Sequence, residues 1–198
     1  MTRIKNQPKA PPEPKAKRWT RKEYYRLYQL GFFRGRRVEL IEGEIVEMPP
    51  MLNPHAVAVS LALDALRAAF GAGYWVRPQL PLHLETNTEP EPDVSVVSGG
   101  ARDYQDHPTM ALLALEISYT SLRFDRERKG NVYARAGIAD YWIVNLVDGE
   151  LEIYRDPQPD PMRPGCSKYG TITILKAGDS VAPLAAANSR IAVSDLFP

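Results

Sequence analysis

One segment of the chain is a run of apolar residues interrupted by a single charge. Residues 111–118 read ALLALEIS, a nearly unbroken apolar pattern that is typical of a β-strand covered on both faces. A strand of this kind needs packed layers above and below it. The segment therefore favours an α/β (mixed α+β) fold in which helices flank a central sheet.

The periodicities of the other segments predict the elements around this strand. Helical spacing, a Thr20–Glu23 capping box and terminating glycines predict helices that start at residue 20 and stop at Gly31, and over residues 55–70 and 122–136. Further strands are expected at residues 38–41, 45–48, 74–84, 93–97, 141–147, 151–154 and 171–175. Asp148-Gly149 predicts a hairpin between two of these strands, and the proline-rich stretch 157–164 is expected to be a loop. The order of elements predicts a mixed sheet with some antiparallel hairpins.

Length and composition predict one folded domain with an arm. A chain of 198 residues, 44% of them hydrophobic, is long enough for one well-buried core and short for two. Residues 1–18 carry six Lys and Arg side chains against one acid, Glu13, together with four prolines. We expect this segment to be a disordered basic arm, which either contacts nucleic-acid phosphates or only aids solubility. Residues 19–198 are expected to form the single domain.

Several classes of protein are disfavoured by what the sequence lacks. Cys166 is the sole cysteine, so no intramolecular disulfide forms and a cytoplasmic location fits best. No apolar run reaches the length of a membrane span, and the first residues do not resemble a signal peptide. His83 and His107 lack the spacing of a zinc site, and Gly71-Ala72-Gly73 does not continue into a phosphate-binding loop.

Three charged residues stand in apolar surroundings. Glu116 interrupts the covered strand, where an isolated buried carboxylate is costly and needs a metal, a cation or a proton. Asp93 heads the apolar strand of residues 94–97. Lys129 falls on the apolar stripe of the helix at residues 122–136. The alternatives remain open at this point: Glu116 is equally well a strand-end charge, and Lys129 is more simply the partner of Asp125 at i, i+4.

Four linked motifs resemble the Uma family of restriction endonuclease-like proteins. They read EPDVSVV at residues 91–97, LEIS at 115–118, DRERK at 125–129 and YARAGIADYWIV at 133–144. The segment ELIEGE at 39–44, His55, and Gln79 with Pro81 also resemble that family's pattern. The likeness extends from Thr20 to Tyr154, and the family is placed in the PD-(D/E)XK nuclease superfamily.

The resemblance implies a metal-dependent DNA endonuclease with a restriction endonuclease-like core. Asp93 and Glu116, with the backbone carbonyl of Ile117, would hold Mg²⁺, with Mn²⁺ as a substitute. Ser118 stands where the superfamily usually has its lysine, and Lys129 takes that place from the helix to orient or deprotonate water.

The resemblance also implies supporting residues and partners. Glu39 is expected to assist from outside the metal shell, although Glu42, Glu44 and Glu47 lie too close in sequence to be distinguished from it. His55 is either a base or a residue that caps and packs. Implied partners are DNA, a divalent metal and a second copy of the chain, by analogy with double-strand cutters. The competing function is a catalytically silent nuclease-fold module that binds nucleic acid or a protein, which the lack of a broad basic face in the body favours.

Overall fold

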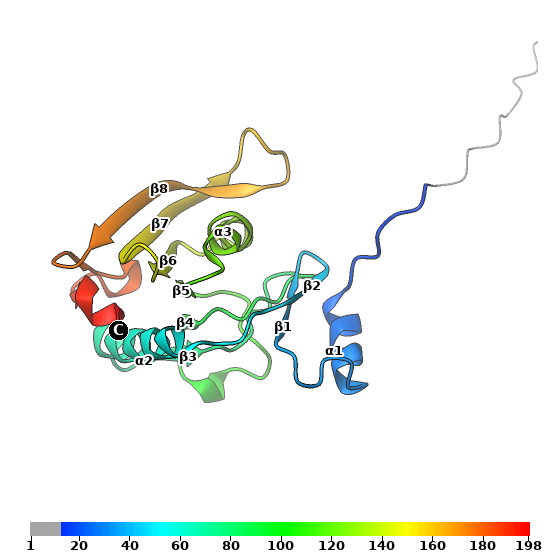
Figure 1. The fold of residues 1–198 in the computed structure, drawn as a ribbon, viewed down its shortest axis with the longest axis horizontal. Helices are drawn as coiled ribbons and strands as arrows, with labels where there is room; N and C mark the ends of the chain where they lie inside the picture. The colour runs from blue at the N-terminus through cyan, green and yellow to red at the C-terminus, as the bar shows by residue number, and fades with distance from the viewer. Residues whose placement is uncertain (1–12) are drawn as a thin grey trace, which may run out of the picture.

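The apolar segment is the third strand of a six-stranded sheet (Figure 1). A computed structural model describes residues 13–198, and in it β5 (Leu113–Ser118) is buried along its whole length. The sheet has the order β3-β4-β5-β6-β7-β8. Its other strands are β3 (Tyr74–Pro78), β4 (Val94–Ser98), β6 (Asp140–Asn145), β7 (Glu150–Pro159) and β8 (Ser167–Lys176). β5 and β6 are parallel and every other neighbouring pair in this sheet is antiparallel, which confirms the predicted mixed sheet.

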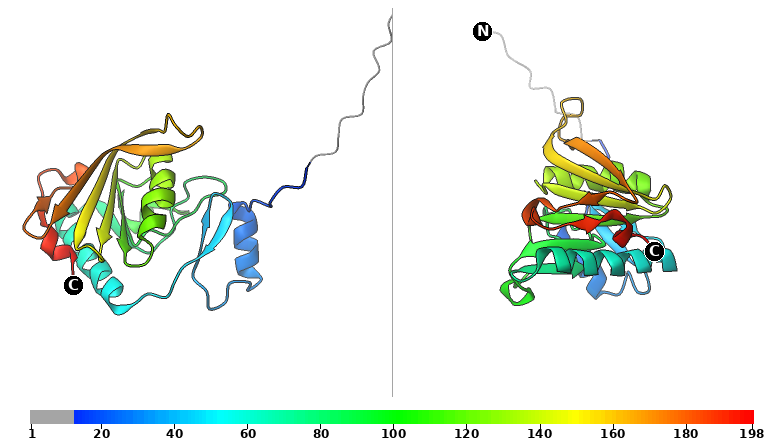
Figure 2. Two further views of the ribbon diagram at one scale, coloured as in Figure 1. Left: turned by 45° about the horizontal axis from the view of Figure 1, so that its top comes forward. Right: turned by 90° about the vertical axis from the view of Figure 1, so that its left-hand side faces the viewer.

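Helices cover both faces of the sheet (Figures 1 and 2). On one face lies α2 (Asn53–Phe70), and on the other lies a continuous helix made of α3 (Leu122–Phe124), a π-helical turn (Asp125–Lys129) and α4 (Gly130–Arg135). Because side chains alternate along a strand, β5 serves both layers. Leu113, Leu115 and Ile117 pack in the core under α2, whereas Ala114 packs in the core under α4.

The first elements form a smaller unit at one end of the sheet (Figure 2). This N-terminal lobe, residues 20–47, consists of α1 (Arg21–Gln29) and the hairpin of β1 (Val38–Ile41) with β2 (Glu44–Glu47). The predicted capping box is present, since the Glu23 N–H reaches the Thr20 hydroxyl and the Glu23 carboxylate accepts from the Thr20 N–H. Tyr24, Val38 and Leu40 form the core of the lobe. An isolated bridge from Leu40 to Glu89 ties it to the body.

The chain ends on the face covered by α2. Here β9 (Ser180–Val181) pairs with β10 (Ile191–Ala192), and two short 3₁₀ turns (Leu184–Ala186 and Val193–Leu196) accompany them. A third 3₁₀ turn, Ala101–Asp103, follows β4. Val181, Ile191, Val193 and Leu196 close the core under α2. No helix within residues 13–198 combines the length and the apolarity that a membrane crossing requires.

Two strand predictions are wrong in their bounds. The strand predicted over residues 74–84 ends at Pro78, because Gln79 has a left-handed backbone (φ 46°) that breaks the extended chain. Pro157 and Pro159, predicted to lie in a loop, belong to β7. Pairing of β7 with β6 stops at Arg155, so beyond that point β7 has a free edge on which proline is tolerated.

The expected basic arm lies mostly outside the described residues, which begin at residue 13. Its last part is attached to the lobe. Lys17 Nζ lies 2.7 Å from Glu23 Oε1, Arg18 forms an ion pair with Glu44, and the Trp19 N–H donates to the Gly43 carbonyl at 2.8 Å.

Candidate active site

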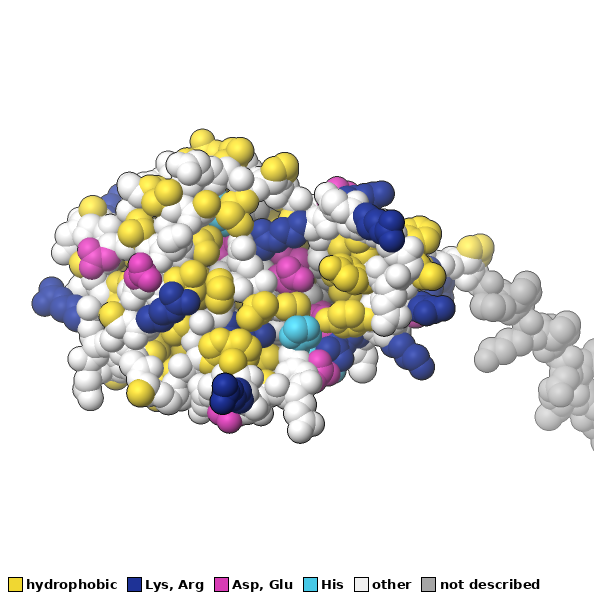
Figure 3. All heavy atoms as spheres, turned by 90° about the horizontal axis from the view of Figure 1, so that it is seen from below, with side chains coloured by type: hydrophobic (Ala, Val, Ile, Leu, Met, Phe, Trp, Pro, Cys, Tyr) yellow, Lys and Arg dark blue, Asp and Glu magenta, His cyan; other side chains and the backbone are white. Residues whose placement is uncertain are grey.

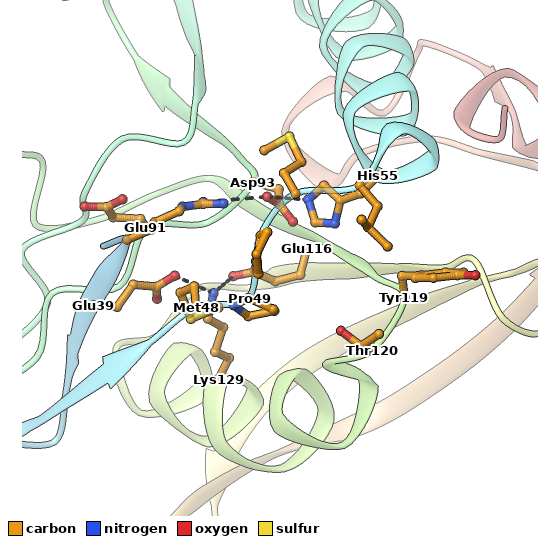
Figure 4. Close-up of a pocket in the computed structure, with 14 residues that line it drawn as sticks. Glu39, Met48, Pro49, His55, Glu91, Asp93, Glu116, Tyr119, Thr120 and Lys129 are labelled. Atoms are coloured by element: carbon orange, nitrogen blue, oxygen red, sulfur yellow. Dashed lines mark hydrogen bonds and ion pairs between the residues drawn. The ribbon is translucent and has the colours of Figure 1, made fainter. Parts of the chain in front are cut away.

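The three charged residues singled out in the sequence lie on one face of the sheet and line one pocket (Figure 4). Asp93 immediately precedes β4, Glu116 lies in β5, and Lys129 ends the π turn that packs over this face. All three side chains are buried. Glu39 and His55, the other two residues expected to contribute, line the same pocket. Three elements distant in sequence therefore bring acids and an amine together.

Glu116 has one oxygen held by the protein and one left over. Its Oε1 accepts from Lys129 Nζ at 2.9 Å and from the Tyr133 hydroxyl at 2.6 Å. Within residues 13–198 no donor hydrogen-bonds to Oε2. Burial raises the pKa of Glu116 well above its usual value. The charge of Lys129 lowers this pKa, whereas the charges of Asp125, Asp93 and Glu39 raise it further. The pocket thus contains a carboxylate that favours added positive charge.

Asp93 is fixed by donors on both oxygens. Its Oδ1 accepts from His55 Nε2 at 2.9 Å and from Gln79 Nε2 at 3.3 Å, and its Oδ2 accepts from the Ile117 N–H at 2.8 Å. Burial alone would raise the pKa of Asp93, but the hydrogen bond and charge of His55, the charge of Lys129 and the Ile117 N–H lower it below its usual value. Asp93 therefore stays ionised.

Ile117 lies at the end of the β4–β5 pairing and next to Asp93. The last paired residues are Val94 and Leu115, so the Ile117 N–H is free to reach Asp93. In a strand the N–H and C=O of one residue point to the same neighbour. The Ile117 carbonyl, expected to be a metal ligand, accordingly lies on the same side of β5 as Asp93.

Lys129 pairs with two glutamates and not with Asp125. Its Nζ lies 2.9 Å from Glu116 Oε1 and 3.2 Å from Glu39 Oε1. Burial lowers the pKa of Lys129, but the charges of Glu116, Glu39, Asp125 and Asp93 outweigh burial and raise it. The ammonium group is therefore protonated in the pocket.

The simpler alternative of an i, i+4 ion pair is wrong because of the π turn. The Gly130 N–H bonds to the Asp125 carbonyl, five residues back, so Asp125 and Lys129 do not stand one turn apart as in an α-helix. Asp125 instead accepts from the Ser118 and Ser121 hydroxyls, each at 2.6 Å. Lys129 is left free for the glutamates.

Glu39 is distinguished from its neighbours by its position. It is fully buried in β1 and lines the pocket, whereas the other three glutamates pair with arginines at or near the surface: Glu42 with Arg135, Glu44 with Arg128 and Arg18, and Glu47 with Arg36. Burial raises the pKa of Glu39, and the charge of Lys129 opposes it. The Glu91 backbone N–H also lowers the pKa of Glu39. The Oε2 atom of Glu39 is buried and has no hydrogen-bond partner among the described residues.

Four further residues shape the site without having been assigned a role from the sequence. Burial raises the pKa of Glu91 to about 7, and the charge of Glu39 adds to the increase. The guanidinium group of Arg37 lies 4.0 Å from Asp93 Oδ1. Gln79 donates a hydrogen bond to Asp93, and Tyr133 donates one to Glu116. The position of Glu91, two residues before Asp93, could have indicated from the sequence that it belongs to the site. Tyr133 could not have been identified, because an aromatic residue on the apolar stripe of a helix predicts core packing.

The donors of the pocket fit a hard divalent cation. The pocket is lined by two cations, Lys129 and Arg37, and by four carboxyl groups, those of Glu39, Glu91, Asp93 and Glu116. Residues 13–198 contain no group of three or more His, Cys, Asp or Glu side chains placed to hold a metal ion. Magnesium does not require such a group, because it is usually bound by one or two carboxylates together with several waters. The cavity volume is about 50 Å³, where one water needs roughly 10–15 Å³. An ion with a few waters fits, whereas a nucleotide does not.

Comparison with known proteins identifies the family and the fold. A family model named Uma2 and described as "Putative restriction endonuclease" matches residues 21–193. The chain belongs to the Uma2 family. The fold of this Uma2 protein also resembles a solved structure described as a putative nuclease belonging to DUF820, from Anabaena variabilis, with a TM-score of 0.62, 17% identity, and coverage of 81% of this chain and 89% of that one. At that identity the likeness shows the fold. No curated protein matches the chain.

Proposed function

We propose that this Uma2 protein is a Mg²⁺-dependent DNA endonuclease that hydrolyses phosphodiester bonds at the pocket of Asp93, Glu116 and Lys129. The observation that carries the proposal is the convergence of these three side chains on one face of the sheet. Phosphodiester hydrolysis needs charge neutralisation as negative charge develops on the phosphate. A pocket that joins two carboxylates to a protonated amine is suited to that reaction.

Asp93 and Glu116, with the Ile117 carbonyl, are the residues that would hold the ion. When bound there, Mg²⁺ supplies a Lewis acid for the phosphate and an activated water. Lys129 and Tyr133 fix Glu116 through Oε1, which leaves Oε2 for the ion. Manganese is expected to substitute, because it accepts the same type of ligand.

Lys129 acts as a cation and donor. Its raised pKa favours stabilisation of negative charge on the phosphate and orientation of the attacking water, and disfavours removal of a proton from that water. Glu39 holds the same ammonium group from the opposite side to Glu116. The ammonium is thus kept in the pocket and does not swing to solvent.

His55 is a positioning residue for Asp93. It stands in the first turn of α2, and its Nε2 lies 2.9 Å from Asp93 Oδ1. Together with the Ile117 N–H on Oδ2, this contact fixes the plane of the carboxylate. His55→Gln, which retains a donor, should keep more activity than His55→Ala.

The direct test is cleavage of plasmid and linear DNA by purified protein with Mg²⁺ or Mn²⁺. We expect Asp93→Asn, Glu116→Gln and Lys129→Met to abolish cleavage, while Glu127→Gln, an exposed position on the same helix, leaves it unchanged. Cleavage that persists in the Asp93 and Glu116 variants would place the reaction elsewhere.

A catalytically silent module is the competing function, and one observation favours it. Residues 38–198 contain 22 Asp and Glu against 13 Lys and Arg, so the body would repel a polyanion. The two functions differ in metal binding, because a ligand of the folded state stabilises it. A nuclease should gain thermal stability with Mn²⁺ and lose that gain in Asp93→Asn; a silent module need not respond to Mn²⁺ at all.

A further inference from the structure

Positive charge is concentrated in the first fifth of the chain. Residues 1–37 contain 12 of the 25 Lys and Arg residues and only two acids. Of these cations, Arg34 has no carboxylate within 4.0 Å among the described residues, and Arg36 has only Glu47 at 3.8 Å, an exposed pair of the kind that contributes little. Figure 3 shows Lys and Arg side chains, with hydrophobic ones between them, on the lobe at the right of the view. This basic face was not expected from the sequence, because its cations are dispersed among aromatic residues.

Shared lining residues link the basic arginines of the lobe, Arg34, Arg36 and Arg37, to the acidic pocket. The pocket shares Arg37 and residues 48–51 with an adjoining hollow, which in turn shares residues 35–37 with a third hollow under Tyr28 and Arg34. Arg37 lines all three. The two outer hollows measure about 330 and 530 Å³, within the roughly 300–1,000 Å³ of ordinary ligand sites. They are large enough for nucleotide units that the acidic pocket cannot admit.

Exposed aromatic and apolar side chains accompany the arginines. Tyr28, Leu30 and Phe32 are 62%, 60% and 64% exposed, three large apolar residues within five positions of sequence. Tyr28 lines the outer hollow together with Arg34. Cations that follow a backbone and aromatic rings on which bases stack are the two parts of a nucleic-acid binding groove.

We infer that the turn of residues 28–37 is the substrate-holding surface of the site, with Arg34 and Arg36 on phosphates and Tyr28 against a base of the strand whose scissile phosphate lies at the mouth of the acidic pocket. This inference rests on the proposed function. A body rich in carboxylates repels DNA, so the strand must be held by a cationic surface that opens directly into the pocket. The two hollows beside the pocket share Arg37 with it and provide such a surface.

The test measures binding without cleavage. Duplex and single-stranded oligonucleotides are titrated by fluorescence anisotropy into Asp93→Asn protein, alone and with Arg34→Gln/Arg36→Gln, at several salt concentrations. Two lost phosphate contacts should make the negative slope of log affinity against log salt less steep by about two. A control with the same charge change, Arg67→Gln/Arg102→Gln at exposed positions on the body, should leave the slope unchanged.

The aromatic contact has its own arm. Tyr28→Ala should weaken single-stranded binding roughly tenfold, the scale of one stacked base, while Tyr28→Phe retains it. If the unmutated protein binds and cuts DNA but the Arg34/Arg36 variant shows an unchanged slope, the inference is overturned and the proposed function stands. Unmutated protein that binds neither oligonucleotide rejects DNA as the substrate, and the inference with it.

Discussion

Lys129 is the cation that two buried carboxylates, Glu116 and Glu39, share. Its replacement by methionine keeps the volume but leaves Glu116 and Glu39 with uncompensated charge. Breaking a buried ion pair from one side costs about 3–5 kcal/mol, so we expect Lys129→Met to lower the free energy of unfolding by that order. Urea denaturation measures it.

The matched control for this prediction is the double variant Lys129→Met/Glu39→Gln. Removing the Glu39 charge, whose Oε2 has no partner among the described residues, should restore part of the lost stability. Equal midpoints for the Lys129 variant and the unmutated protein would show that the ammonium group does not compensate the two acids.

At the scale of residues, the sequence identified side chains whose charge conflicts with their surroundings. Asp93, Glu116 and Lys129 were each found in this way, and the structure places them in one pocket. Arg37, Gln79 and Tyr133 were not identified in this way, because an arginine or glutamine in a loop and a tyrosine on a helix conflict with nothing locally; Gln79 was named only as part of the family resemblance. Their contribution depends on contacts across the fold, which no local pattern contains.

At the scale of elements, a buried carboxylate outside the pocket also attaches the π-containing helix to the sheet. Arg126 donates to Glu152 of β7 at 3.0 and 2.7 Å, and Glu152 is 1% exposed. We expect Arg126→Ala to cost about 1.5–3 kcal/mol, the range for hydrogen bonds to charged groups. Thermal or urea unfolding checks this value.

The neighbouring arginine provides the comparison. Arg123 pairs with Glu127 at 3.2 Å with both side chains mostly exposed, and Arg123→Ala should cost roughly 0–1 kcal/mol. If the two variants lose the same stability, the Arg126–Glu152 contact does not anchor the helix.

The N-terminal lobe should loosen in acid before the body does. Hydrogen bonds from Arg21 and the His107 N–H lower the pKa of Asp106 to about 2. A lowered folded-state pKa gives stability that is present above the unfolded value of 3.8 and is lost as pH falls toward 2. We expect the protection of α1 amides against hydrogen exchange, relative to the unfolded chain at the same pH, to fall between pH 4 and pH 2. Asp106→Asn should reduce this pH dependence and leave the part due to Glu23, whose pKa the contacts with Lys17 and Thr20 also lower to about 2. An unaltered profile in that variant would exclude Asp106 as a contributor.

Elements were predictable where periodicity is regular. The covered strand, the helix before β3 and the hairpin at Gly149 (φ 66°) follow the expected patterns. The π turn was not predicted, because an additional residue in a helix leaves the apolar stripe recognisable while shifting which charges face each other. The early end of β3 was also missed. Gln79 has a left-handed backbone, but a glutamine does not indicate that conformation as a glycine or asparagine would.

At the scale of the whole molecule, each chain has one proposed catalytic pocket, so cutting both strands of a duplex in one binding event requires two chains. We expect supercoiled plasmid to be nicked at low protein concentration and linearised at high concentration, with a dimer detected by light scattering in the latter range. Linear product at protein concentrations where only monomer is present would contradict this expectation.

The alternation along β5 has a consequence for how the chain tolerates change. Odd positions 113, 115 and 117 support the hydrophobic core under α2, and Glu116 lies on the opposite face, in the proposed site. Inserting or deleting one residue between positions 111 and 116 would exchange the two sets, so folding and chemistry would fail together. Length variation should instead be confined to connections such as residues 160–166, whose backbone takes no part in the sheet. A scan of single-residue insertions would then map the strand as an intolerant block beside permissive loops.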